Sequence, residues 1–233
     1  YTPGDDVKNI DWKVSTRLGR PFVKRYTEER ESIVMLLIDM SASQRFGSHF
    51  GSKLDRCAEV AAVLAFNAVK NNVKVGVLFF TDQVEHYIPP KKGTSHIWRV
   101  IKEIFTFSPK GSGTRIGQAL DYLGKIMKKK AFVFVISDFM DKDYLSCLKA
   151  LRQKHEVIAV MIHDRGEAGL PLKGIISMSD FETGKPLFFD AYSRNVQQAF
   201  SDARSAQRRR TLDTFSKARS DVIELSTDTS VSD

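Results

Sequence analysis

The feature that most constrains the fold of this chain is an apolar run, residues 33–38, that has no polar interruption and ends in Asp39. A strand that is apolar on both sides must be covered on both faces, as the central strands of a parallel sheet are. A second such run, residues 131–136, is followed by Ser137 and Asp138. The two runs predict parallel strands whose carboxyl ends bring both aspartates to one edge of an α/β sheet.

Hydroxyl side chains lie close to the first aspartate in the sequence. Ser41 and Ser43 follow Asp39 at alternate positions of the predicted turn, and Thr114 comes from a glycine-rich loop that precedes a helical pattern. Side chains at alternate positions can converge on one point, and a carboxylate with neutral hydroxyls suits Mg²⁺, which prefers oxygen ligands and keeps several waters. The alternative is that Ser41 and Ser43 only cap the next helix.

Asp39, Ser41, Ser43, Thr114 and Asp138, in that order, resemble the metal-ion-dependent adhesion site of von Willebrand factor A domains. The likeness extends to the N-terminal segments YTPGDDV, IDWK, GRPFVK and EERE, which resemble the signature that precedes this domain in one bacterial family. That family is associated with MoxR ATPases and is of unknown function. The resemblance covers essentially the whole chain.

The resemblance implies a set of roles for these residues. Ser41, Ser43 and Thr114 become candidate direct ligands of Mg²⁺, with Mn²⁺ or Ca²⁺ as alternatives, and Asp39 and Asp138 lie in the inner shell or act through water. The open coordination position would take a carboxylate from a partner protein. The implied partner is a MoxR-type AAA+ ATPase or its client. One departure, the segment QRFG at residues 44–47 where methionine and an acidic or polar residue are common, affects the expected loop shape.

The chain of 233 residues, 42% of them hydrophobic, can bury one sizeable core. We predict a doubly wound α/β domain with a mostly parallel sheet over residues 32–226, a β-hairpin inserted near 174–190, an N-terminal extension over 1–31 and a disordered tail over 227–233. Strands are expected at 73–80 and at 84–88, the latter ended by Pro89 and Pro90. Because the chain begins within the family signature, we expect a missing upstream region.

The net charge of +8 and pI near 9.4 raise the question of nucleic-acid binding. No helix-turn-helix, zinc-ligand or stacking-aromatic pattern accompanies the basic residues, so an acidic protein surface is the better expectation. Cys57 and Cys147 lie in helical patterns without metal-ligand spacing, which favours packed thiols in the cytoplasm. No apolar stretch approaches the roughly 18–20 residues that span a bilayer.

Catalysis is not expected, because the nucleophile patterns of hydrolases are missing. The chain has no Gly-x-Ser-x-Gly elbow, and its glycine loop at residues 111–117 lacks the Gly-Lys-Ser/Thr ending of a nucleotide site. The function that the resemblance implies, a metal-dependent protein-binding module, is therefore preferred over an enzyme. The alternatives are a non-catalytic scaffold with a vestigial metal site and, more distantly, a Mg²⁺-dependent hydrolase.

Overall fold

The computed structural model describes residues 6–24, 32–45, 52–164, 175–179, 186–190 and 193–228. The chain forms two compact units, Tyr1–Glu31 and Ser32–Asp233. In the first unit a short 3-10 helix, η1 (Val7–Asn9), precedes α1 (Trp12–Leu18). The carboxylate of Asp11 caps α1, because it accepts a hydrogen bond from the Val14 backbone N–H.

The second unit is built on a six-stranded sheet in the order β3-β2-β1-β4-β5-β8. All neighbouring pairs are parallel except β2 with β3. The strands of this sheet are β1 (Ile33–Asp39), β2 (Lys74–Phe80), β3 (Val84–Lys91), β4 (Phe132–Ser137), β5 (Glu156–His163) and β8 (Asp221–Ser226). A separate antiparallel hairpin consists of β6 (Ile175–Ser179) and β7 (Pro186–Asp190).

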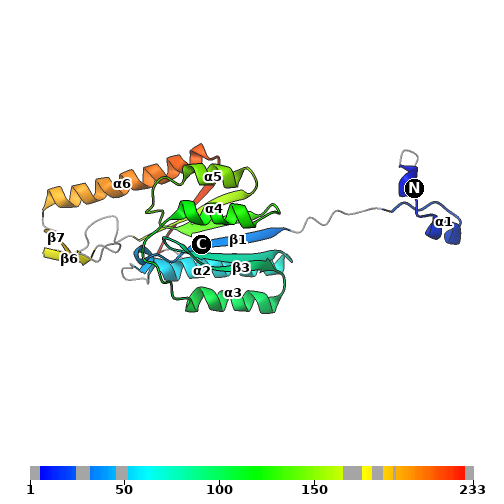
Figure 1. Cartoon of the computed structure of the whole chain (residues 1–233), viewed down its shortest axis with the longest axis horizontal. Helices are drawn as coiled ribbons and strands as arrows, with labels where there is room; N and C mark the ends of the chain where they lie inside the picture. The colour runs from blue at the N-terminus through cyan, green and yellow to red at the C-terminus, as the bar shows by residue number, and fades with distance from the viewer. Residues whose placement is uncertain are drawn as a thin grey trace. The chain divides into compact units, whose positions relative to one another are not determined.

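Helices cover both faces of the sheet (Figure 1). They are α2 (Lys53–Lys70), α3 (Thr94–Thr106), α4 (Ile116–Ile126), α5 (Leu145–Arg152) and α6 (Arg194–Lys217), with a 3-10 turn, η2 (Ala42–Arg45), after β1. Met35 and Leu37 of β1 pack in the cluster that includes α4, α5 and α6, whereas Leu36 and Ile38 pack in the cluster that includes α2 and α3. Burial on both faces explains why β1 is apolar throughout, and the predicted doubly wound α/β fold is confirmed.

The direction of winding reverses at β1. The chain passes from β1 through α2 to β2 on one side, and it later enters β4 on the other side of β1. The carboxyl ends of β1 and β4 therefore lie side by side at a topological switch point, where open α/β sheets bind their ligands. Asp39 is the last residue of β1, and Asp138 directly follows β4.

The prediction that Pro89 and Pro90 end the strand after residue 88 is wrong. Strand β3 continues through both prolines to Lys91. This is tolerated because β3 is the edge strand of the sheet, with β2 as its neighbour, and because the pairing register shifts between Val75 and Val77, opposite the prolines. A proline without a backbone N–H is accommodated at such an edge or bulge.

The C-terminal end of the domain also differs from the expected tail. Thr227 is buried, its backbone N–H donates to the carbonyl of His163 at 3.0 Å, and its hydroxyl donates to the Asp164 carboxylate at 2.7 Å. The Arg56 guanidinium donates to the Thr227 carbonyl at 2.7 Å. These bonds fix Thr227 next to β5, so a disordered tail does not start there. Residues 229–233 lie outside the described residues.

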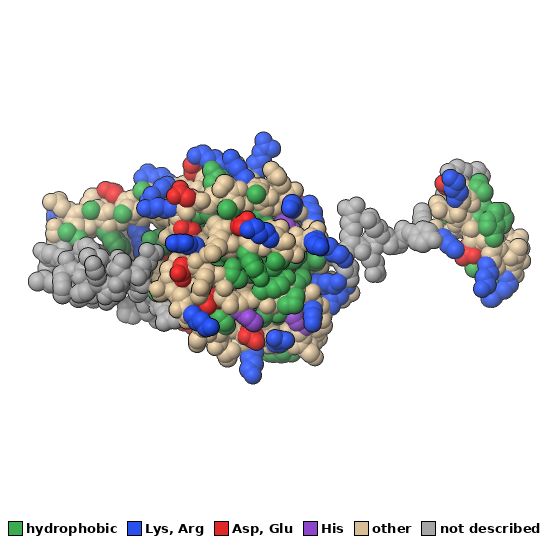
Figure 2. All heavy atoms as spheres, in the orientation of Figure 1, with side chains coloured by type: hydrophobic (Ala, Val, Ile, Leu, Met, Phe, Trp, Pro, Cys, Tyr) green, Lys and Arg blue, Asp and Glu red, His purple; other side chains and the backbone are tan. Residues whose placement is uncertain are grey.

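Lysine and arginine side chains are scattered over the face seen in Figure 2, mixed with aspartate and glutamate, and do not form one continuous basic stripe. Within the part of the chain that the structure describes, no helix is both long enough and apolar enough to cross a bilayer. Cys57 is buried and Cys147 is half-buried, and both are free thiols.

Candidate metal site at the switch point

Asp39 is fully buried, and three hydrogen bonds hold its carboxylate in place. One oxygen accepts from the Ser41 backbone N–H at 2.9 Å. The other accepts from the Ser137 hydroxyl at 2.5 Å and from the Gln44 amide at 3.2 Å. The position of the carboxylate is therefore fixed by β1, by β4 and by the turn that follows β1. Such a carboxylate can orient a bound cation or the waters around it.

The two predicted serines meet in this turn. The hydroxyl oxygens of Ser41 and Ser43 lie 3.1 Å apart, with Ser41 buried and Ser43 half-buried. Helix η2 begins directly after Ser41, so Ser41 precedes this helix and Ser43 lies within it. Both hydroxyls are therefore available as neutral oxygen ligands next to Asp39.

The loop that carries Thr114 is attached to the same region. The Ala42 N–H donates to the Ser112 carbonyl at 2.9 Å, and the Arg115 N–H donates to the Thr81 carbonyl at 3.0 Å. Thr114 itself is half-buried and precedes α4. The structure thus places Thr114 in the loop beside Ser41 and Ser43, and among the described residues the Thr114 hydroxyl has no hydrogen bond.

Close packing requires a glycine at one position of this loop, Gly111. A Cβ atom on Gly111 would lie 2.2 Å from a carboxylate oxygen of Asp82 and 2.3 Å from the Thr81 hydroxyl. Gly117 lies inside α4, where a Cβ would lie 3.7 Å from both Cys147 and Tyr144. Neither glycine has a positive φ. A Cβ would therefore overlap its neighbours at Gly111, whereas at Gly117 it would make ordinary van der Waals contacts.

Asp138 contacts a residue that the sequence did not suggest. One of its carboxylate oxygens lies 2.5 Å from the ammonium of Lys53, and the exposed fractions of the two side chains are 3% for Asp138 and 1% for Lys53. Its other oxygen accepts from the Met140 N–H at 3.3 Å. A buried ion pair between β4 and the start of α2 therefore forms part of the site.

The two carboxylates influence each other electrostatically. Burial first, and then the negative charge of Asp138, raise the pKa of Asp39 to about 6, although hydrogen bonds from Ser137 and Ser41 lower it in part. Burial and the charges of Asp39 and Asp138 also raise the pKa of the Cys57 thiol well above its ordinary value. Cys57 is therefore a protonated, packed thiol at neutral pH, and the two acids place negative charge close together at this edge of the sheet.

A bound divalent cation should compete with the proton on Asp39. Mg²⁺ affinity is expected to fall as the pH drops below about 6, because the cation must then displace that proton. The stability of the metal-free fold should depend on pH in the opposite direction. The pKa of Asp39 is raised from 3.8 to about 6 on folding, so its contribution to the free energy of unfolding is present at low pH and is lost as the pH rises through about 6. Calorimetric titrations at about pH 5 and about pH 7 check the first effect, and equal affinities would contradict it.

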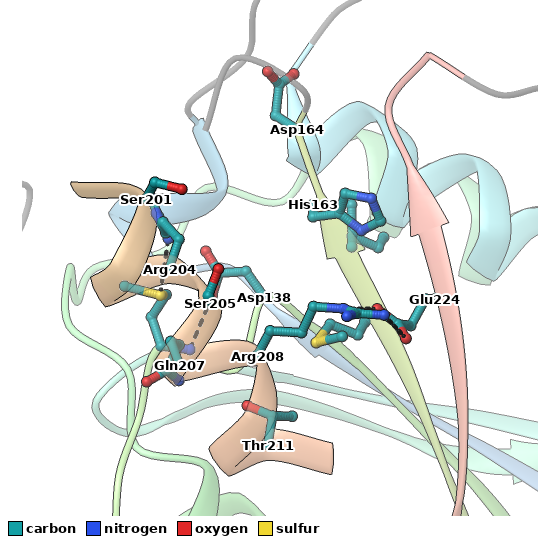
Figure 3. Close-up of a pocket in the computed structure, with 13 residues that line it drawn as sticks. Asp138, His163, Asp164, Ser201, Arg204, Ser205, Gln207, Arg208, Thr211 and Glu224 are labelled. Atoms are coloured by element: carbon teal, nitrogen blue, oxygen red, sulfur yellow. Dashed lines mark hydrogen bonds and ion pairs between the residues drawn. The ribbon is translucent and has the colours of Figure 1, made fainter. Parts of the chain in front are cut away.

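A groove of about 490 Å³ opens beside Asp138. Figure 3 shows Asp138 between the side chains of α6 and the end of β5. On the α6 side, Arg204 lies over the ring of Phe200, and Arg208 pairs with Glu224 through two bonds of 2.7 and 2.8 Å. The lining of the groove is mostly apolar but includes charged side chains of both signs, and Asp138 belongs both to this lining and to the candidate site.

Sequence reasoning missed three residues that support the site: Gln44, Lys53 and Ser137. Gln44 is fully buried and links Asp39 to the thiol of Cys57, which lies 3.5 Å from the amide oxygen. The departure from the usual pattern at residue 44 thus supplies a hydrogen-bond donor to the central aspartate. Lys53 carried a signal of its own, because a cation at the first position of a helix faces the positive end of the helix dipole.

Comparisons with known proteins agree with this architecture. An uncharacterised protein of Mycobacterium bovis, Mb1516, is 28% identical over 231 residues, which are 98% of this chain and 73% of that protein. The structure of BatB from Bacteroides thetaiotaomicron is similar with a TM-score of 0.55 at 16% identity, over 84% of this chain and 90% of that one. An aerotolerance-related membrane protein from Bacteroides fragilis gives 0.57 at 17% identity, over 83% and 91% of the two chains.

These structural similarities support the fold alone, because the identities are low. At the level of the sequence, the model of a protein family described as a protein of unknown function, DUF58, matches residues 1–210. That match covers both the N-terminal unit and the strands and helices that carry the candidate site. The chain therefore belongs to the DUF58 family.

Proposed function

We propose that this chain is a metal-dependent protein-binding module, which binds and does not catalyse. Ser41, Ser43 and Thr114 would supply hydroxyl ligands to Mg²⁺, and Asp39 and Asp138 would hold it directly or through water. Bound there, Mg²⁺ would supply an open coordination position for a carboxylate of a partner protein. Neutral direct ligands leave such a cation able to attract an anionic ligand.

The observation that carries the proposal is the gathering of oxygen groups at the switch point. Asp39 and Asp138 follow neighbouring parallel strands, the Ser41 and Ser43 hydroxyls lie 3.1 Å apart, and the loop of Thr114 is bonded to Ala42. Two buried carboxylates this close need positive charge nearby. Hydroxyls and carboxylates are ligands that suit Mg²⁺.

The groove beside Asp138 is where the segment around a partner's acidic side chain would lie. Arg204, Gln207 and Arg208 line it from a single helix, where the Gln207 amide donates to the Phe139 carbonyl and the Arg208 guanidinium pairs with Glu224. The scattered basic surface in Figure 2 favours an acidic protein surface over the backbone of a nucleic acid. By the family resemblance the partner would be a MoxR-type AAA+ ATPase, or a client protein presented to it during complex assembly or maturation.

A second candidate function, a scaffold that needs no metal, is favoured by one observation. The ammonium of Lys53 lies 2.5 Å from Asp138 and supplies positive charge inside the site. If this charge were sufficient, partners would bind equally well with and without divalent cations. Metal dependence of binding therefore separates the two functions.

Thr114→Ala should weaken partner binding at least about tenfold in Mg²⁺ while leaving the stability within about 0.5 kcal/mol. The loss of one ligand lowers metal affinity, whereas a half-buried loop hydroxyl contributes little to packing. The measurement is titration of a purified MoxR-type ATPase into this chain, with Mg²⁺ or with EDTA, together with melting curves of both variants.

Thr106→Ala is the matched control, because this exposed hydroxyl on α3 bonds only within its own helix in the contacts recorded, to the Lys102 carbonyl at 2.8 Å. It should bind the partner as the wild type does. If partner binding is unchanged by both Thr114→Ala and EDTA, the metal is not part of the interface, and the scaffold function is favoured.

A further inference from the structure

Lys53 is placed where neither the helix nor the protein interior favours a cation. It is the first residue of α2, after a capping box in which Ser52 and Asp55 exchange hydrogen bonds. The N-terminus of a helix carries partial positive charge, so a lysine there is electrostatically unfavourable. Its side chain is also only 1% exposed, and burial of an ammonium is costly unless negative groups compensate for it. The compensation must come from the carboxylates of the site.

Three charged groups surround the same small volume. Lys53 and Cys57 are four residues apart on α2 and therefore lie on one face of the helix. The Cys57 thiol donates to the Gln44 amide oxygen at 3.5 Å, and the Gln44 amide nitrogen donates to Asp39 at 3.2 Å, so this face of α2 lies against both aspartates. The Lys53 ammonium is thus next to the candidate metal ligands and in direct contact with Asp138.

We propose that the Lys53 ammonium is a built-in cation of this site, which stabilises the metal-free domain and sets a low affinity for divalent cations. This inference rests on the proposed metal site. A divalent cation that binds beside Asp39 and Asp138 is repelled by the buried ammonium of Lys53. The Asp138 carboxylate must then either contact both cations or lose its contact with Lys53. A partner carboxylate adds the negative charge that offsets this repulsion. Metal and partner are therefore expected to bind together, each raising the affinity of the other.

The test is Lys53→Met, which keeps an unbranched side chain of similar length and removes the charge. Mg²⁺ and Mn²⁺ are titrated into the full chain by calorimetry, and melting temperatures are recorded in EDTA and in millimolar Mg²⁺. Lys53→Met should bind either metal at least about tenfold more tightly than the wild type. Its melting temperature should be lower in EDTA and should rise with Mg²⁺ far more than that of the wild type.

Lys70→Met is the matched control, because Lys70 lies exposed at the other end of the same helix. It should leave metal affinity unchanged. If Lys53→Met folds only when Mg²⁺ is present, the exchange of one cation for the other is supported. If both Lys53→Met and Lys53→Gln remain unfolded even in millimolar Mg²⁺, the exchange is refuted, because no metal can replace the ammonium.

The remaining outcomes separate this inference from the proposed function. Equal Mg²⁺ affinity of Lys53→Met and wild type overturns the role of Lys53 and leaves the metal-dependent function intact. If Lys53→Met binds Mg²⁺ and the wild type does not, the role of Lys53 is supported and the metal-dependent function of the wild-type protein is overturned. Absence of binding in both variants overturns both.

Discussion

Asp39→Ala is expected to abolish Mg²⁺ binding, with at least about a hundredfold loss of affinity. The carboxylate of Asp39 is fully buried and accepts hydrogen bonds from Ser41, Gln44 and Ser137. Its removal takes away negative charge and also frees the turn that positions the Ser41 and Ser43 hydroxyls. Calorimetric titration of Mg²⁺ and Mn²⁺ into the variant measures the loss.

Asp39→Asn separates the charge from the hydrogen bonds. The amide keeps the shape of the side chain and one acceptor oxygen, so the turn should largely persist while the negative charge is absent. We expect Asp39→Asn to fold as the wild type does and to bind Mg²⁺ almost as poorly as Asp39→Ala. Metal binding by Asp39→Ala at wild-type strength would place the metal elsewhere in the molecule.

Asp138→Ala should destabilise the domain by about 3–5 kcal/mol, the range typical of breaking one side of a buried ion pair. Lys53 would keep its buried position while losing the carboxylate 2.5 Å from its ammonium. Urea unfolding followed by circular dichroism measures the free energy of unfolding. The double variant Lys53→Met with Asp138→Ala should recover much of the loss, because it removes both charges.

Asp213→Ala is the control for this comparison. Asp213 pairs with Lys217 at 2.6 Å on α6, but the exposed fractions of the two side chains are 58% and 56%. Loss of such a surface pair should cost less than about 1 kcal/mol. If Asp138→Ala is no more destabilising than Asp213→Ala, the buried Lys53–Asp138 pair contributes no more to the free energy of unfolding than an exposed pair does.

Much of the fold could be predicted because positions that are buried in the structure are apolar in the sequence. The apolar run of β1 serves two helical layers, so every position in it is apolar, and this pattern identified a central parallel strand. The prolines of β3 were misinterpreted because their effect depends on whether the strand is central or at an edge. That is a property of the assembled sheet, which the local sequence does not contain.

In the candidate site, too, local contacts could be predicted from the sequence and contacts between distant residues could not. Asp39, Ser41 and Ser43 are adjacent in the sequence, so their convergence follows from local geometry. The contact between Lys53 and Asp138 joins residues 85 positions apart, and no spacing rule reveals it. One hint was present in the sequence, since a lysine at the start of a helix faces the positive end of the helix dipole and is stabilised by a negative partner.

The glycine-rich loop bears on how Thr114 could move. In related von Willebrand factor A domains the threonine loop shifts toward the metal, and Gly111, Gly113 and Gly117 are expected to permit such a shift here. In the structure none of them has a positive φ, and a Cβ on Gly111 would overlap Thr81 and Asp82. The movement of Thr114 toward a metal stays a prediction, and it would have to come from the segment between Gly111 and the start of α4 as a whole.

The central claim, that this edge of the sheet binds a divalent cation through Asp39, Ser41, Ser43, Thr114 and Asp138, is tested most directly by anomalous diffraction from crystals grown with Mn²⁺. We predict an anomalous peak at bonding distance from the hydroxyls of Ser41 and Ser43, with the carboxylates of Asp39 and Asp138 next to it. A map without a peak at this position at saturating Mn²⁺, or with the only peak elsewhere in the molecule, would contradict the account.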